Sequence, residues 1–128
     1  MESSQQIGGR EFDWFASDSE SRLALFATGG CGPVPDTVRG SIQAHDELSD
    51  SVAASGWGTR AVWQSYARLG LFAFDWSEQH GCYVRVAVPT EEPSLELRNR
   101  ITACLSLPSL GVCFAGSELI RPIWPHGT

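Results

Sequence analysis

Apolar and polar positions group into two pairs of short segments, and each pair predicts a β-hairpin. Residues 11–17 and 22–28 are rich in aromatic and aliphatic side chains and flank a turn of Asp, Ser and Glu, residue types that often bond their own backbone. Residues 71–76 and 82–88 form the second pair. Both faces of the first hairpin carry apolar side chains, so we expect it to be covered on both sides.

Alternation along the second hairpin predicts which side chains share a face. We expect Phe74 to lie opposite Val84 on the core face of the sheet. Asp75 and Arg85 would then share the other face as diagonal neighbours within reach of each other.

Apolar residues spaced by three or four positions predict three helices, at about 37–55, 59–69 and 94–105. His45 falls on the apolar face of the first helix, together with Ile42 and Leu48 in the same spacing. This histidine is therefore more consistent with the edge of a core than with a ligand site.

These elements together predict an α+β fold. We expect a mainly antiparallel sheet built from two hairpins plus short C-terminal strands at 111–115 and 118–124, with about three helices packed on it. Residues 1–10 are polar and are expected to form a flexible tail, which leaves 11–128 as a single α+β domain.

Composition and charge limit the classes of partner. Hydrophobic residues make up 42% of the 128-residue chain, the formal net charge is −6, and all nine basic residues are Arg. This acidity disfavours nucleic acid, which requires clustered cations, and it suits a basic protein surface. The chain has no apolar run long enough for a membrane helix and no signal-peptide pattern, so we expect a cytoplasmic protein without a membrane partner.

Cys31, in a glycine-rich turn, is the candidate nucleophile, and His45 or His80 would be its base. Nothing in the sequence places either histidine beside it, and the favoured interpretation is a loop cysteine in a protein that is not an enzyme. The other cysteines, Cys82, Cys104 and Cys113, form no CxxC pair and no zinc pattern. We therefore expect free thiols, with one disulfide as the alternative in an oxidising compartment, so the redox state of the four cysteines is left open. We expect no catalytic residue and no metal or other cofactor.

Acidic residues on the predicted first helix give the candidate binding surface. Asp46, Glu47 and Asp50 lie on its polar side and are open to three interpretations: a solvated face, a patch that binds a partner, or a metal site. Trp57, between two glycines, either folds back over the helices or serves as an anchor for a partner. We take these four residues as the candidate partner-binding residues.

Three acidic residues near the first turn, Asp13, Asp18 and Glu20, invite a calcium interpretation. They lack the glycine and the bidentate glutamate of an EF-hand loop. A polar hairpin tip is the favoured interpretation.

The stretch 12–35, FDWFASDSESRLALFATGGCGPVP, resembles the opening of a family of small, mostly uncharacterised bacterial proteins. The shared pattern is an aromatic "DWF" strand, an acidic turn, an "LALF" strand and then T-x-G-x-G-P-x-P. Such proteins look like the immunity proteins encoded beside polymorphic toxins, which bind and neutralise a cognate toxin. The resemblance implies no catalytic residues.

The resemblance and the charge together predict an antitoxin-like immunity protein. It would neutralise a cognate bacterial toxin that has a basic surface, by protein–protein interaction without catalysis. The alternative is a small-molecule-binding or regulatory domain with a pocket between sheet and helices. The oligomeric state is left open by the sequence.

Overall fold

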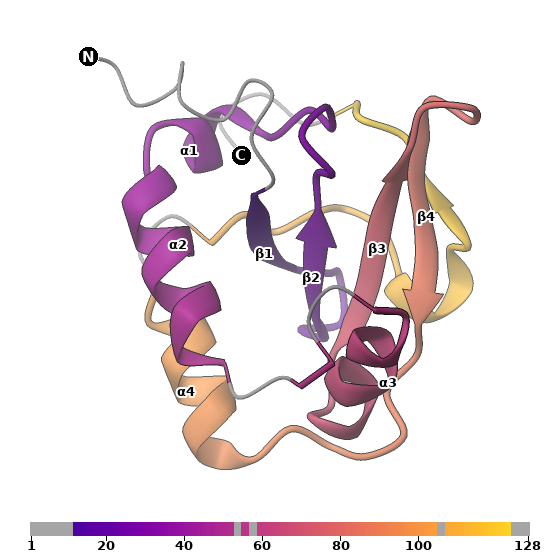
Figure 1. The fold of residues 1–128 in the computed structure, drawn as a ribbon. Coiled ribbons are helices and arrows are strands. Elements are labelled where there is room, and N and C mark those ends of the chain that lie inside the picture. The colour runs from indigo at the N-terminus through magenta and orange to yellow at the C-terminus, as the bar shows by residue number, and fades with distance from the viewer. Residues whose placement is uncertain (1–11, 53–54, 57–58, 105–106, 124–128) are drawn as a thin grey trace.

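The computed structural model describes residues 12–52, 55–56, 59–104 and 107–123. A five-stranded mixed sheet runs in the order β1-β2-β3-β4-β5 (Figure 1). The strands are β1 Asp13–Ser17, β2 Leu23–Ala27, β3 Phe72–Ser77, β4 Cys82–Ala87 and β5 Leu119–Ile120. The helices are α1 Asp36–Arg39, α2 Ile42–Ser51, α3 Ala61–Arg68, α4 Leu95–Thr102 and a 3₁₀ helix, Phe114–Gly116.

The sheet consists of two antiparallel hairpins that meet along a parallel pair. Strands β1 and β2 are antiparallel, as are β3 and β4, while β2 and β3 run parallel. Strand β5 adds an antiparallel edge beside β4. A parallel neighbour requires a crossover connection, and α1, α2 and α3 lie within it. The predicted α+β class and mostly antiparallel sheet are therefore confirmed, and the parallel centre is the feature that the sequence did not reveal.

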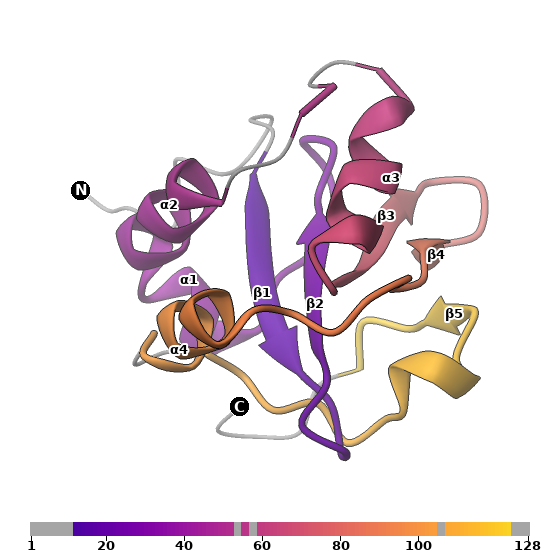
Figure 2. The same cartoon turned by 90° about the horizontal axis from the view of Figure 1, so that it is seen from below.

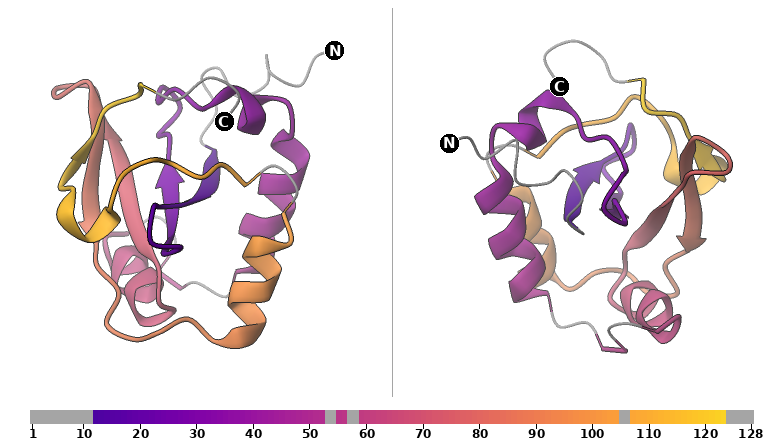
Figure 3. Two further views of the ribbon diagram at one scale, coloured as in Figure 1. Left: turned by 180° about the vertical axis from the view of Figure 1, so that it is seen from behind. Right: turned by 45° about the horizontal axis from the view of Figure 1, so that its top comes forward.

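Apolar layers cover both faces of the sheet. On one face, Trp14, Phe26 and Phe74 stack across β1, β2 and β3, with ring centroids 4.3 Å and 5.0 Å apart. The C-terminal segment crosses this face (Figure 3) and buries Phe114 against it. On the other face the sheet packs against residues of α2, α3 and α4, including Leu48, Tyr66 and Ile101. The expectation that the first hairpin is covered on both sides is confirmed.

Helix α2 lies beside β1, next to α4 (Figure 2), while α3 lies over the sheet farther along. The edge of β1 is partly occupied by the C-terminal segment. The Ser17 N–H donates to the Pro108 carbonyl at 3.0 Å, and the Leu110 N–H donates to the Ser17 carbonyl at 2.8 Å. No helix in the described part of the chain is long and apolar enough to cross a membrane.

The predicted register of the second hairpin is wrong by one position. Phe74 lies opposite Arg85 and not Val84, and Asp75 lies opposite Val84. A slip of one residue moves a side chain to the other face of the sheet, so Asp75 and Arg85 are not neighbours. The Arg85 guanidinium instead donates to the carbonyls of Phe114 and Ala115, each at 2.9 Å.

A turn shorter than predicted explains the slip. Ser77 pairs with Cys82, and the Gly81 N–H donates to the Ser77 carbonyl at 2.8 Å. Gly81 has a φ of 63°, which glycine adopts without the steric cost of a Cβ. Trp76 consequently lies opposite Tyr83.

The predicted first helix, 37–55, is two helices. Ser41, with φ −142° and ψ 42°, leaves the helical region between α1 and α2, and α2 ends at Ser51. Gly40 and Ser41 are both weak helix formers, so an apolar face alone does not hold the helix continuous.

The helices predicted at 59–69 and 94–105 are present as α3 and α4. The predicted strand 111–115 is instead irregular chain leading into the 3₁₀ helix, and β5 falls within 118–124. The predicted tail, residues 1–10, lies outside the described residues.

Candidate functional site

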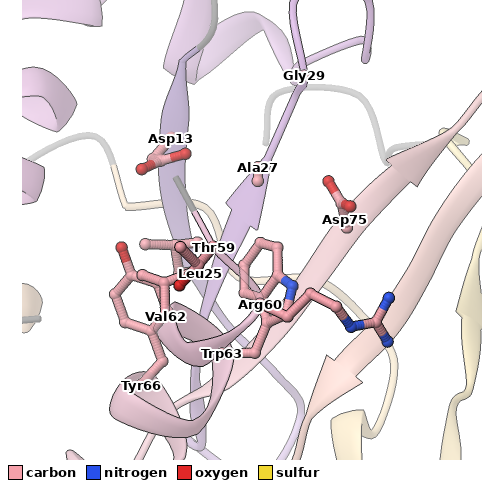
Figure 4. Close-up of a pocket in the computed structure, with 10 residues that line it drawn as sticks. All are labelled: Asp13, Leu25, Ala27, Gly29, Thr59, Arg60, Val62, Trp63, Tyr66 and Asp75. Atoms are coloured by element: carbon pink, nitrogen blue, oxygen red, sulfur yellow. The ribbon is translucent and has the colours of Figure 1, made fainter. Parts of the chain in front are cut away.

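Two carboxylates face the same side of the sheet from separate strands. Asp13 on β1 and Asp75 on β3 both pair with Ala27 on β2, so the three residues form one cross-strand row. Two strand spacings separate the Cα atoms of the aspartates by about 10 Å. Because the middle position is Ala, the row is open between the two acidic side chains (Figure 4).

Helix α3 forms the wall of a pocket over this row. The pocket has a volume of about 390 Å³ and includes Leu25, Val62, Trp63 and Tyr66 as its apolar and aromatic lining. Val62 and Tyr66 face the sheet because they share the buried side of α3, while Trp63 is half-buried at the rim. The Trp63 and Tyr66 rings are 6.2 Å apart between centroids.

The electrostatic environment of the pocket is negative. Burial, and then the charge of Asp13, raise the pKa of the Tyr66 hydroxyl well above its usual range. The field of Asp13 therefore acts in a poorly hydrated part of the pocket. Arg60 is the basic residue of the described lining, and Figure 4 shows its guanidinium turned away from Asp13.

Helix α2 brings its acidic residues next to this pocket. The Ser49 hydroxyl donates to Asp13 Oδ2 at 3.4 Å, which sets this side of α2 against the pocket. Asp46 lies one turn before Ser49 on the same side and is half-buried, while Glu47 and Asp50 are exposed. Of the predicted binding residues, Asp46 therefore lies on the side of α2 that faces the pocket, whereas Glu47, two residues before Ser49, lies about 200° around the helix from it.

The fourth candidate residue, Trp57, lies outside the described residues. Its predicted role in binding stays a prediction. The rim of the pocket on this side is formed in the described chain by Thr59 and Arg60.

His45 is fully buried and lies against Cys104 rather than acting as a base for an exposed cysteine. Its Nδ1 accepts the Phe15 N–H at 3.1 Å, and its Nε2 is 4.0 Å from Cys104 Sγ. Because Nδ1 accepts this hydrogen bond, the neutral ring carries its hydrogen on Nε2, and Nε2 then has no lone pair with which to take a proton from a thiol. This geometry suits a structural histidine and disfavours a Cys–His nucleophile pair.

The glycine-rich stretch that holds Cys31 forms a structural turn. The Thr28 hydroxyl accepts the N–H groups of Phe12 and Gly30, at 3.1 Å and 3.3 Å. A Cβ on Gly32 would lie 2.6 Å from the Tyr83 hydroxyl, which donates to the Pro33 carbonyl at 2.8 Å. The glycines thus allow a close backbone approach to the sheet, and Cys31 is exposed at the turn.

The acidic residues of the first hairpin turn do not form a metal site. Asp18 is buried, and its carboxylate accepts the backbone N–H groups of Glu20, Arg22 and Phe114. Within the described ranges, no group of three His, Cys, Asp or Glu side chains could hold a metal ion.

The placement of Asp13 and Asp75 on either side of Ala27 is the feature that sequence reasoning missed. The tripeptide Phe-Asp-Trp occurs twice, at 12–14 and 74–76, and each copy places one carboxylate in an otherwise apolar strand. This repeat was the available indication. Knowing that β1 and β3 flank the same strand was necessary to bring the two carboxylates together.

The fold and the pocket define a small α+β domain with an acidic, aromatic-walled site on one side. Comparison with models of protein families, with curated proteins and with solved structures finds no match. The chemistry available at this site is recognition of positive charge, since carboxylates and aromatic rings both attract cations.

Proposed function

We propose that this chain is an antitoxin-like immunity protein, which binds and neutralises a cognate toxin without catalysing a reaction. The observation that carries the proposal is the acidic surface formed by the pocket and α2. Asp46, Glu47 and Asp50 lie on α2, which contacts the pocket through the hydrogen bond from Ser49 to Asp13, and Asp13 and Asp75 line the pocket itself. Such a surface complements a basic active site or a basic nucleic-acid-binding face on a toxin.

The distribution of the basic residues supports the same proposal. Helix α2 contains no Arg. Several arginines are instead engaged within the fold: Arg22 lies over the Phe72 ring, and Arg85, Arg98 and Arg100 donate to backbone carbonyls. Arg100 reaches the Ser51 carbonyl at the C-terminal end of α2, while residues 42–50 of this helix carry three acidic side chains and no Arg. This local negative charge would speed the encounter with a basic partner.

Co-expression with the product of the adjacent gene tests the proposal. We expect that product to arrest growth when expressed alone, and growth to return when this chain is present. Persistent arrest, or an adjacent product that is not toxic, would overturn the proposal.

A matched pair of triple variants locates the surface. We expect Asp46→Asn, Glu47→Gln and Asp50→Asn together to weaken neutralisation and slow association. A control with Glu20, Glu91 and Glu92 changed to Gln removes the same charge from exposed positions elsewhere and should retain neutralisation. Equal loss in the two triple variants would show that net charge alone matters, and would remove α2 as the interface.

A small-molecule-binding or regulatory domain is the second candidate, and the pocket of about 390 Å³ favours it. Ligand sites in proteins combine apolar walls with a few convergent polar groups, as this pocket does. A metabolite screen by thermal unfolding tests this candidate, because a ligand that binds the native state raises its stability.

A further inference from the structure

We propose that the pocket between β1–β3 and α3 binds a small organic cation, an aromatic ring attached to an alkylammonium group. This inference goes beyond the proposed function and does not depend on it. The site lies over Ala27, with Asp13 and Asp75 on either side and Trp63 and Tyr66 along α3.

The position of the carboxylates selects a cation. An ammonium group above Ala27 would be flanked by Asp13 and Asp75, each one strand away. It would hydrogen-bond to carboxylate oxygens with the strength of a charge-assisted contact. An anion in the same place would be repelled by both aspartates.

The existing contacts of these aspartates are compatible with a ligand. Asp13 already accepts the Ser49 hydroxyl through Oδ2. A carboxylate has about four acceptor positions on its two oxygens. A carboxylate that accepts one hydrogen bond within the protein, as Asp13 does, can therefore also accept one from an ammonium group.

The apolar walls select the body of the ligand. Leu25 and Val62 are buried, and Trp63 is half-buried with its indole bordering the pocket (Figure 4). An aromatic ring can pack against these side chains and leave its alkylammonium tail to reach the aspartates. The volume of about 390 Å³ is at the lower end of the range of ligand pockets, which suits one ring system with a short tail.

Arg60 does not cancel the acidic character of the site. Its side chain is exposed, and its guanidinium is turned away from Asp13 (Figure 4). As a residue at the rim it would instead exclude ligands that carry a second positive charge near the ring.

Calorimetric titration of the full chain with three matched pairs of probes tests the inference. The amines are benzylamine, phenethylamine and tryptamine, and each is compared with the alcohol of the same shape. We expect at least one amine to bind at least about tenfold more tightly than its alcohol, since loss of a charged hydrogen bond costs at least that ratio. If no amine binds more tightly than its alcohol, the inference is wrong, and this comparison requires no variant.

Variants then place the amine in the pocket. Asp13→Asn with Asp75→Asn should reduce the affinity for that amine by at least about tenfold, whereas Glu91→Gln with Glu92→Gln should change it by less than about twofold. The control pair has the same charge change at exposed positions. Equal losses in both double variants, or unchanged affinity in the first, would overturn the assignment to this pocket.

Loss of folding and loss of toxin neutralisation are measured separately from loss of amine binding. Each variant is checked by thermal unfolding, and where the double variant does not fold, Asp13→Asn and Asp75→Asn are titrated singly. In the wild-type protein, the indole N–H resonance of Trp63, assigned with Trp63→Phe, should shift on addition of the amine. Toxin neutralisation without any amine binding would remove this inference and leave the proposed function intact. Amine binding without toxin neutralisation would support this inference and remove the proposed function.

Discussion

The carboxylate of Asp18 accepts the backbone N–H of Phe114, 96 residues further along the chain, at 2.8 Å. Its other oxygen accepts the N–H groups of Glu20 and Arg22, at 2.9 Å and 2.8 Å. One buried side chain therefore ties the first hairpin turn to the 3₁₀ helix that covers the sheet. Such tertiary hydrogen bonds to a charged acceptor are stronger than those between neutral groups.

Substitution of this residue should destabilise the fold. Asp18→Asn keeps the shape but replaces an acceptor oxygen with an NH₂ group that faces a backbone donor, so we expect a loss of about 2–3 kcal/mol in the free energy of unfolding. Urea denaturation measures it. Glu20→Gln, at the exposed neighbouring position, should change stability by less than about 0.5 kcal/mol. Equal effects at the two positions would contradict the structural role of Asp18.

Gly70 and Gly81 provide a comparison between two turns. Both have positive φ, 95° and 63°, but a Cβ on Gly70 would lie 2.3 Å from Pro93 N, whereas one on Gly81 meets nothing within 4 Å. Gly81→Ala should cost about 1–2 kcal/mol for the left-handed backbone alone. Gly70→Ala adds a backbone clash and should cost more than about 3 kcal/mol.

Thermal and urea unfolding of the two glycine variants measure this difference. Gly81→Ala is the control, since it shares the backbone conformation without the clash. A Gly70→Ala protein as stable as Gly81→Ala would show that α3 and the segment before α4 are not in contact as described.

Alkaline pH should destabilise the protein through its two tyrosines. Burial raises the pKa of both hydroxyls well above the usual range, and the charge of Asp13 adds to the effect at Tyr66. At Tyr83 the hydrogen bond from Trp14 lowers the pKa and the charge of Asp75 raises it, and burial outweighs both. The unfolded chain ionises at a pKa of about 10 while the native state stays neutral. Stability is therefore full below about pH 10 and falls as the pH rises above it.

Ultraviolet absorbance of tyrosinate measures this titration. We expect the absorbance to appear together with the loss of far-ultraviolet circular dichroism, in one cooperative transition. Tyrosinate that forms while the fold is intact would contradict the burial of these hydroxyls. Tyr83→Phe should reduce the absorbance change of the alkaline transition, because one tyrosine remains. It should also lower stability at neutral pH, because the Trp14 indole N–H and the Pro33 carbonyl lose their hydrogen bonds to the Tyr83 hydroxyl.

The sequence predicts the elements of this fold better than their relations in space. Aromatic strand segments and apolar helix faces are local patterns, and β1, β2, α3 and α4 follow them closely. The register of the second hairpin depends on the length of one turn around Gly81, and the parallel contact of β2 with β3 depends on the whole crossover. Neither is encoded in the alternation of apolar and polar residues.

The same difference applies to the candidate site. The acidic residues of α2 could be recognised in the sequence as a cluster, because they lie within five consecutive positions of one helix. The pocket aspartates are 62 positions apart by their numbering, 75 minus 13, and only the strand order makes them neighbours of Ala27. The pocket aspartates are therefore brought together by strand pairing between distant parts of the chain, which the local pattern of apolar and polar residues does not reveal.

His45, which the sequence suggested as a candidate base, lies in the core of the protein. His45→Leu fills a similar volume but removes the acceptor of the buried Phe15 N–H. A buried donor without an acceptor loses its hydration without compensation, so we expect a loss of about 1–3 kcal/mol in unfolding free energy. Urea denaturation provides the measurement.

The same substitution at the exposed His80 is the control for His45→Leu. His80 lies in the turn between β3 and β4, where its ring contacts the Ser77 hydroxyl at 2.8 Å near solvent. Water can replace that contact, so His80→Leu should change stability by less than about 0.5 kcal/mol. If His45→Leu were as stable as His80→Leu, the Phe15 N–H would have another acceptor in solution, and the structural role of His45 would be contradicted.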